Sequence, residues 1–219
     1  MDAAEKLFAA HGYDGVGMRA LATEAGVNLG AATYHFGSKE SLYVETFLRR
    51  FRPANAMRMT LLREAQAEAE ATGIPIALER IVECMVRPPL QTCLEHPEFP
   101  SLLARNLFHP PPFMEQVVRE AVVPSIQAFI GAFSKALPQL PPDLILIREM
   151  LSMGSVLIFS AHLGRVPGLP RAKPEAFEFL LKELVQFISA GLRCAPATPA
   201  SQRPPLPFVL PFPLPEFKT

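Results

Sequence analysis

The stretch RALATEAGVNLGAATYHFGSK, residues 19–39, decides the fold of the N-terminal part of this 219-residue chain. Gly26 lies at its centre and can adopt the left-handed backbone conformation that a tight turn between two helices requires. Ala22 precedes this glycine and Ala32 follows it, and small side chains at these places let two helices approach closely. The spacing predicts a helix-turn-helix, whose second helix inserts into the major groove of DNA.

Apolar residues recur at helical spacing on both sides of this turn. We expect a first helix that ends at Gly12, a recognition helix that begins after Asn28 and ends before Gly37, and a next helix capped by Ser38. Pro53 permits a bend before a further helical segment. The expected helices of this part cover residues 3–11, 18–25, 29–36, 39–51 and 54–71.

Five more helical segments follow, over residues 76–94, 97–108, 113–137, 143–163 and 174–193. Kinks or breaks are expected at Pro88–Pro89 and at Pro124. No segment alternates with period two, so the predicted fold is all-α with about nine helices. We expect a helix-turn-helix three-helix domain over residues 1–52, a C-terminal helical bundle over 53–194 and a Pro-rich tail over 195–219.

Composition limits the classes of function. Apolar residues make up 49% of the chain, which excludes a largely disordered protein. The net charge is zero, so binding of nucleic acid by bulk electrostatics is not expected, although a local contact surface remains open. The last 25 residues contain eight prolines. They form either a tail without a specific role or a segment that docks as polyproline.

Several kinds of site have no support in the sequence. Cys84, Cys93 and Cys194 form no CxxC pair, and no carboxylate or histidine pair repeats at metal-ligand spacing. We therefore expect no metal and no cofactor. Charged residues interrupt the start of the chain and the apolar run over 144–163, so neither a signal peptide nor a membrane span is expected. The predicted location is the cytoplasm.

The recognition helix has polar but uncharged side chains, namely Asn28, Thr33, Tyr34 and His35. They suit hydrogen bonds to phosphate oxygens and base edges. Lys39 lies near the start of the next helix and can add a phosphate contact. For two of these residues an alternative to DNA contact stays open. Tyr34 could be a buried, half-polar core residue, and His35 could pack at the end of the helix.

The segment DAAEKLFAAHGYDGVGMRALATEAGVNLGAATYHFGSKESLY resembles the DNA-binding domain of the TetR family of transcriptional regulators. Four blocks carry this resemblance over residues 3–47: AAxxLFxxxGY, the AxxAGV turn, YHFGSK and the following leucine. The sequence pattern NLxAxxYHFGSKExLY is similar to that of the CecR-like branch of the family. The resemblance implies that the DNA-facing residues are Asn28, Gly30, Thr33, Tyr34, His35 and Lys39.

Two departures from the family pattern are visible. Gly17 and Met18 stand where a Ser or Thr commonly caps the second helix, so one customary phosphate contact is expected to be missing. The family also usually carries further residues, often basic, ahead of the position of Met1. Residues 1–52 contain six Lys or Arg and six Asp or Glu, which is unusually neutral for a domain that binds DNA.

The C-terminal part is rich in Met and Phe, which favours either plain core packing or a pocket for an apolar ligand between helices. For the pocket, the predicted ligand-binding residues are Met85, Phe108, His109, Phe129, Phe133, Met153 and His162.

The last two helices are the predicted dimer interface. The resemblance implies that they pair with their symmetry mates in a four-helix bundle. A broad apolar stripe on the last helix and small residues on the one before it suit such packing. The predicted interface residues are Ser152, Gly154, Ser155, Phe177, Leu181, Leu184 and Ile188.

We therefore predict a ligand-responsive, homodimeric transcriptional repressor, not an enzyme. Its expected partners are a palindromic double-stranded DNA operator and a small-molecule effector. The alternative is an all-α small-molecule-binding protein or enzyme without operator binding, for which no nucleophile–base pair, P-loop or dinucleotide motif is seen.

Overall fold

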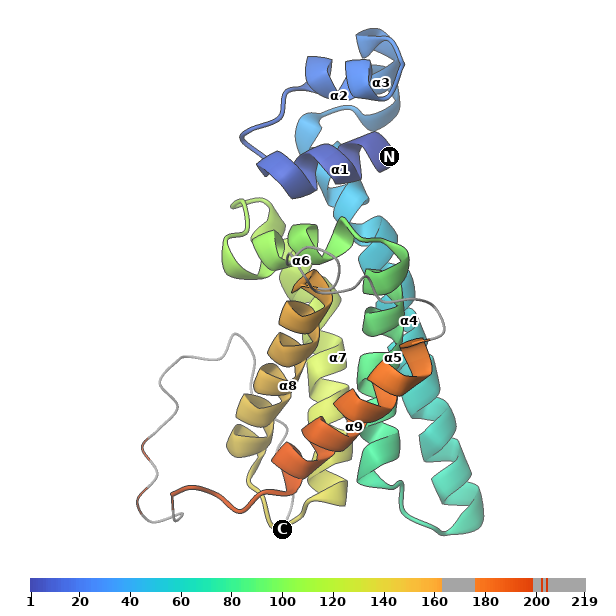
Figure 1. Cartoon of the computed structure of the whole chain (residues 1–219), viewed down its shortest axis with the longest axis vertical. Helices are drawn as coiled ribbons and strands as arrows, with labels where there is room; N and C mark the ends of the chain where they lie inside the picture. Colours follow the sequence, from blue (N-terminus) through green and yellow to red (C-terminus); the bar gives the residue numbers. More distant parts are fainter. Residues whose placement is uncertain (163–175, 199–201, 203, 205–219) are drawn as a thin grey trace. The chain divides into compact units, whose positions relative to one another are not determined.

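The computed structural model describes residues 1–162, 176–198, 202 and 204. This part of the chain is all-α, as predicted, and contains nine helices and no strand (Figure 1). Most of the predicted tail, 195–219, lies outside the described residues. The helices are α1 (Asp2–His11), α2 (Met18–Glu24), α3 (Leu29–Phe36), α4 (Lys39–Thr72), α5 (Leu78–Glu95), α6 (Phe99–Phe108), α7 (Met114–Ala136), α8 (Pro142–His162) and α9 (Phe177–Arg193).

The chain forms two compact units that are not consecutive in sequence. Unit 1 contains Met1–Ala56, Pro89–Ala121 and the end of α8 from Leu157. Unit 2 contains Met57–Pro88, Val122–Val156 and α9. Four helices, α4, α5, α7 and α8, therefore run through both units.

Unit 1 has a single core to which distant parts of the sequence contribute. Phe8 of α1 and Tyr43 and Phe47 of α4 are fully buried in it. Phe99 and Leu102 of α6 complete the same core, and the rings of Phe47 and Phe99 lie 6.3 Å apart. The helix-turn-helix is thus held by residues around position 100 as well as by its own helices.

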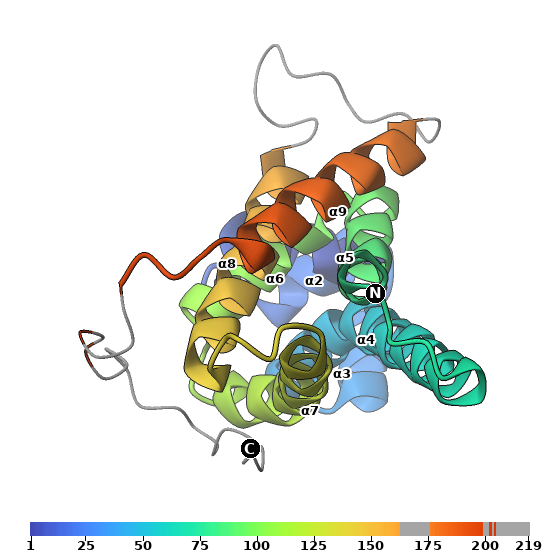
Figure 2. The same cartoon turned by 90° about the horizontal axis from the view of Figure 1, so that it is seen from below.

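Unit 2 is a helical bundle in which α9 packs across α5 and α8, as the two views of Figures 1 and 2 agree. Phe129 and Phe133 of α7 are fully buried, and their ring centroids are 6.2 Å apart. Arg148 of α8 donates to the carbonyl of Leu192 at 2.6 Å and to that of Cys194 at 2.7 Å. It therefore satisfies carbonyls at the C-terminal end of α9 that have no partner within the helix.

The prolines do not interrupt the helices. Helix α4 runs for 34 residues with Pro53 inside it, and α7 continues through Pro124. Helix α5 likewise contains Pro88 and Pro89. Of the expected kinks or breaks, the breaks are therefore wrong. Pro53 and Pro124 are exposed, so water can take the place of the hydrogen bond that each proline removes.

Helix α7 and residues 142–161 of α8 are long and apolar enough to cross a membrane, by length and composition only. Core helices of soluble proteins pass the same test. Both helices supply buried residues to the bundle, and α8 buries the carboxyl group of Glu149 inside it. This packing accounts for part of their apolar character, since 28% of the apolar window of α7 and 39% of that of α8 are buried.

Candidate nucleic-acid interface

The turn between α2 and α3 has the geometry that its sequence predicts. Gly26 has a φ of +66°, in the left-handed region. The N–H of Val27 donates to the carbonyl of Ala22 at 3.0 Å and closes the turn. Ala22 and Ala32 are both buried, so small side chains allow the contact between α2 and α3.

Helix α3 is fixed at both ends by its own sequence. The side-chain oxygen of Asn28 accepts a hydrogen bond from the N–H of Ala31 at 3.0 Å, as an N-cap does. At the other end, Gly37 has a φ of +72° and its N–H donates to the carbonyl of Thr33 at 2.8 Å. The short helix therefore begins and ends where the sequence predicts.

Five of the six predicted DNA-facing residues are exposed on this segment: Asn28, Gly30, Thr33, Tyr34 and His35. The side chain of Tyr34 is 95% exposed, which rules out the alternative of a core residue. The ring of His35 lies edge-on to that of Phe36, with centroids 4.6 Å apart, and remains exposed. The side chain of Tyr34, on a helix capped by Asn28, is therefore accessible to another molecule.

Lys39, the sixth predicted residue, lies at the first position of α4 in a small cluster. Its ammonium group is 4.0 Å from the centroid of the Tyr13 ring. The hydroxyl of Tyr13 donates to the carboxylate of Glu40 at 2.6 Å. Burial, and then this hydrogen bond, raise the pKa of Tyr13 to about 12, and the same hydrogen bond lowers the pKa of Glu40. Near neutral pH Tyr13 is therefore a neutral phenol that donates to the Glu40 carboxylate.

Arg19, in the first turn of α2, was not predicted as a site residue. It is exposed, and among the described residues it has no ion-pair partner. The sequence could have indicated it, because Arg19 is the one basic residue of α2 and a basic side chain there can contact a phosphate.

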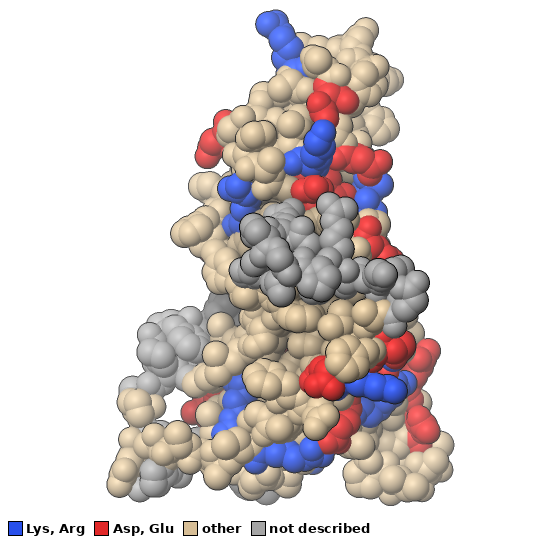
Figure 3. Space-filling view, in the orientation of Figure 1, with Lys and Arg blue, Asp and Glu red and all other residues tan. Residues whose placement is uncertain are grey.

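Other charges of unit 1 are paired with one another. Arg49 binds Asp2 at 2.7 Å, Arg50 binds Glu5 at 3.0 Å and Lys6 binds Glu24 at 2.7 Å. Figure 3 shows basic and acidic side chains interspersed on the face in view. Lys6, Arg49 and Arg50 are thus neutralised locally. Arg19 and Lys39, which lie at the helix-turn-helix, are candidates for phosphate contacts.

The predicted ligand-binding residues are not brought together around one cavity. Met85, Phe129 and Phe133 are fully buried in unit 2, where they pack as core residues. Met153 is half-buried in the same unit. By contrast, Phe108 and His109 lie at the end of α6 in unit 1, with Phe108 61% exposed. The side chain of His162 lies outside the described residues.

A cavity of about 340 Å³ does exist in unit 2, at the connection between α4 and α5. Ala69 of α4, Ile81 of α5 and Ala132 of α7 form apolar walls, while Glu70 and Lys135 supply charge. None of the predicted ligand-binding residues that the structure describes lines it. The periodicity of the sequence could not reveal it, because the cavity is formed where three helices and a connection meet.

Two buried ionisable side chains, Arg58 and Glu149, lie in the core of unit 2. The guanidinium of Arg58 is 4.9 Å from the centroid of the Phe129 ring. Glu149 is also buried, and this burial raises its pKa to about 7 against the opposing effect of the Arg58 charge. Neither residue was predicted as a site residue, since single charges within helices have no distinctive spacing.

The residues predicted for the dimer interface have contacts within their own subunit. Leu181, Leu184 and Ile188 are buried within unit 2, so the apolar stripe of α9 serves the core of its own subunit. Phe177 is half-buried, and the guanidinium of Arg87 is 5.6 Å from the centroid of its ring.

The small residues predicted on α8 have other contacts. Ser152 is buried and donates to the carbonyl of Arg148 at 2.6 Å. Ser155 donates to the carbonyl of Leu151 at 2.9 Å, and both Ser155 and Gly154 are half-buried.

The exposed apolar side chains lie elsewhere on these two helices. On α9 they are Phe179, 63% exposed, and Phe187, 69% exposed. On α8 they are Met150, Leu151 and Ile158. The longest apolar stripe in the sequence of α9 corresponds to its buried face, and these exposed residues lie outside that stripe.

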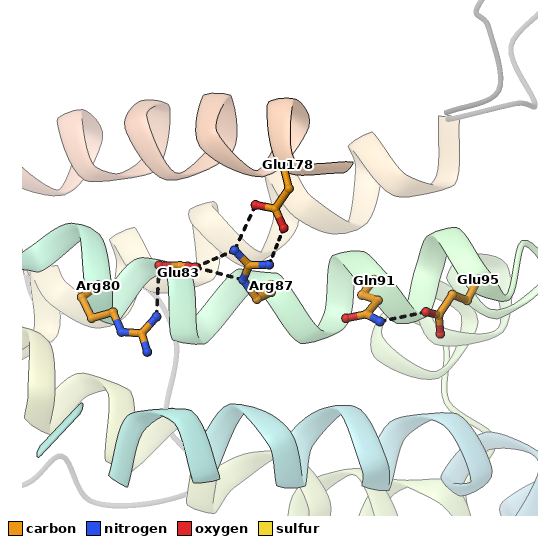
Figure 4. Close-up of polar contacts among 6 residues, drawn as sticks. All are labelled: Arg80, Glu83, Arg87, Gln91, Glu95 and Glu178. Atoms are coloured by element: carbon orange, nitrogen blue, oxygen red, sulfur yellow. Dashed lines mark hydrogen bonds and ion pairs between the residues drawn. The ribbon is translucent and has the colours of Figure 1, made fainter. Parts of the chain in front are cut away.

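Ion pairs fix α9 against α5 (Figure 4). Arg87 of α5 binds Glu178 of α9 through two hydrogen bonds, at 2.7 and 3.1 Å, and also binds Glu83. At the other end of α9, Arg193 binds Glu79. These pairs lower the pKa values of Glu178 and Glu79. They hold α9 with its Phe179–Phe187 face outward.

Comparison with protein families gives two matches. Residues 1–46 match the family described as bacterial regulatory proteins, tetR family. Residues 83–191 match the tetracyclin repressor-like, C-terminal domain. Together the matches cover more than two thirds of the chain. Neither distinguishes the CecR-like branch, which stays a prediction. No curated protein matches the sequence.

Solved structures share the fold. PfmR, a TetR family regulator from Thermus thermophilus, is 21% identical with a TM-score of 0.61, covering 88% of this chain and 98% of its own. SCO3833 from Streptomyces coelicolor is 18% identical with a TM-score of 0.62, covering 88% and 90%. HlyIIR, a hemolysin II transcriptional regulator, is 20% identical with a TM-score of 0.58, covering 88% and 94%.

Proposed function

Because this chain belongs to the TetR family of bacterial DNA-binding transcriptional regulators, we propose that it is a repressor released from a palindromic operator by a small apolar molecule. The observation that carries the operator contact is the 95% exposure of Tyr34 on a short helix capped by Asn28. A helix of this kind presents its polar side chains to the major groove.

The proposed contacts follow from the chemistry of each side chain. The oxygen of Asn28 caps α3, so its amide N–H groups remain as donors to the DNA. Thr33, Tyr34 and His35 supply further hydrogen-bonding groups, and the absence of a side chain at Gly30 permits close approach to the backbone of the DNA. Lys39 contacts a phosphate, and Arg19 adds a second cation on α2.

The repressor is proposed to act as a homodimer through α8 and α9. Phe179 and Phe187 of α9 are exposed, as are Met150 and Leu151 of α8. Scattered exposed apolar residues are normal, but large ones on adjacent helices mark an interaction surface. A twofold dimer would bury each of them twice and present two copies of α3 to a palindrome.

The effector is proposed to bind in unit 2, in the cavity between α4, α5 and α7. Ala69, Ile81 and Ala132 suit an apolar body, and Lys135 or Glu70 suits one polar group. Helix α4 links this cavity to Lys39, since one continuous helix contains both Ala69 and Lys39. A ligand with different affinities for the DNA-bound and DNA-free states would then shift the population between them.

Family members are soluble DNA-binding regulators, and we place this one in the cytoplasm. The discriminating experiment is a gel shift with the DNA upstream of the protein's own gene. A specific shift that unrelated DNA does not compete away supports the repressor. A failure to bind any fragment of that region favours the alternative of a small-molecule-binding protein or enzyme.

A further inference from the structure

Arg105 of α6 holds the C-terminal end of α1. Its Nε donates to the carbonyl of Ala9 at 3.1 Å, and its Nη2 donates to the carbonyl of Ala10 at 3.0 Å. The last carbonyls of a helix have no partner within the helix, and a cation beside them also meets the negative end of the helix dipole. One side chain of α6 therefore fixes the end of a helix some 95 residues earlier in the chain.

The chain turns tightly around this guanidinium after α1. Gly12 has a φ of +73°, a conformation that favours glycine. A Cβ atom at this position would lie only 3.1 Å from Nη1 of Arg105. The close approach shows that the turn is built against Arg105.

The next residue, Tyr13, connects this turn to the DNA-facing segment. Its ring packs edge-on against Phe113, with centroids 4.9 Å apart. Its hydroxyl donates to Glu40, and the ammonium of Lys39 lies over its ring at 4.0 Å. A continuous series of contacts within unit 1 thus leads from Arg105 to Lys39.

We propose that Arg105 is a positioning residue for operator binding: it holds the end of α1 and the Tyr13 turn, and through them the ammonium of Lys39. The proposal rests on the proposed contact of Lys39 with a phosphate. It assigns α6 to the DNA-binding machinery, although α6 lies far outside residues 1–52.

The test is a double-mutant cycle in the full chain, with operator affinity as the readout. Lys39→Ala should weaken binding about tenfold, and Arg105→Met about fivefold. The double variant should bind no more weakly than Lys39→Ala alone, because Arg105 acts through Lys39. Arg105→Lys keeps the charge and can reach one carbonyl, so it should retain part of the affinity. Arg119→Met, which removes an exposed cation of the same unit, is the control and should bind like the wild type.

Hydrogen exchange on the DNA-free chain provides a readout that is independent of operator binding. Arg105→Met, but not Arg119→Met, should accelerate exchange of amides in residues 9–17 and 37–42. Unchanged exchange in Arg105→Met would overturn the positioning role, as would operator affinity equal to that of the control. Losses that multiply in the double variant would show that Arg105 acts independently of Lys39. If exchange changes as expected but Lys39→Ala binds normally, the proposed phosphate contact fails instead.

Discussion

Replacing Phe187 by Glu should convert the protein from a dimer to a folded monomer. Phe187 is 69% exposed on α9 within one subunit, so a charge there meets water in the monomer and causes no internal clash. In the dimer, the same carboxylate would be buried against an apolar surface, which is unfavourable without a partner. Leu184→Glu should behave differently, because Leu184 is buried in the core.

The size of the effect can be worked out from the exposed surface. If a Phe side chain presents about 200 Å², Phe187 at 69% exposure has about 140 Å² left to bury. At about 25 cal/mol per Å², this burial is worth about 3.5 kcal/mol. A twofold interface contains the residue twice, which gives at most about 7 kcal/mol. Even half of this corresponds to about a 300-fold weaker dimer.

Analytical ultracentrifugation at micromolar concentration measures the oligomeric state, and circular dichroism measures the thermal stability. Phe187→Glu should sediment as a monomer with a wild-type melting temperature, whereas Leu184→Glu should melt at a markedly lower temperature. Ile74→Glu is a matched control, since Ile74 is 68% exposed in the connection between α4 and α5. A Phe187→Glu variant that stays dimeric, or a Leu184→Glu variant that stays fully stable, would refute this assignment of the two faces of α9.

Three further predictions concern DNA, pH and ligand. Tyr34→Ala should weaken operator binding about fivefold or more without changing the melting temperature, and an unchanged affinity in fluorescence anisotropy would contradict the placement. Glu149 has a pKa of about 7 in the fold against 4.5 for the free side chain, so the folded state holds its proton more firmly. The free energy of unfolding should therefore fall by up to roughly 3 kcal/mol between pH 5 and pH 8. Glu149→Gln should flatten this dependence in urea unfolding, and an equal slope in both proteins would exclude Glu149 as its source. Apolar compounds should raise the melting temperature and release DNA, and Ala132→Phe, which fills the cavity, should abolish both effects. A response that survives this substitution would move the effector site elsewhere.

The helix-turn-helix was predictable because local chemistry determines it. Asn28 can cap only the helix that follows it, and Gly26 and Gly37 adopt positive φ values where the chain must turn. Each requirement involves residues a few positions apart, so the sequence displays them directly. The sequence left a core position for Tyr34 open, and the structure resolves this because Ala32 supplies the buried side of α3.

Features that depend on distant contacts were not predictable. The contact of Arg105 with the end of α1, and the share of Phe99 in the core of unit 1, join segments about a hundred residues apart. Helical periodicity identifies an apolar face but not what covers it. The stripe of Leu184 and Ile188 suited both the subunit's own core and a partner, and the structure places both residues in that core.

Hydroxyl-radical footprinting on the DNA upstream of the protein's own gene tests the central claim most directly. The account predicts protection of two patches on one face of the duplex, about 10 base pairs or a multiple of this apart, because two copies of α3 enter successive major grooves. Tyr34→Ala should weaken both patches equally. Protection of a single patch, or none at concentrations at which the protein is dimeric, would contradict operator recognition by a symmetric pair of recognition helices.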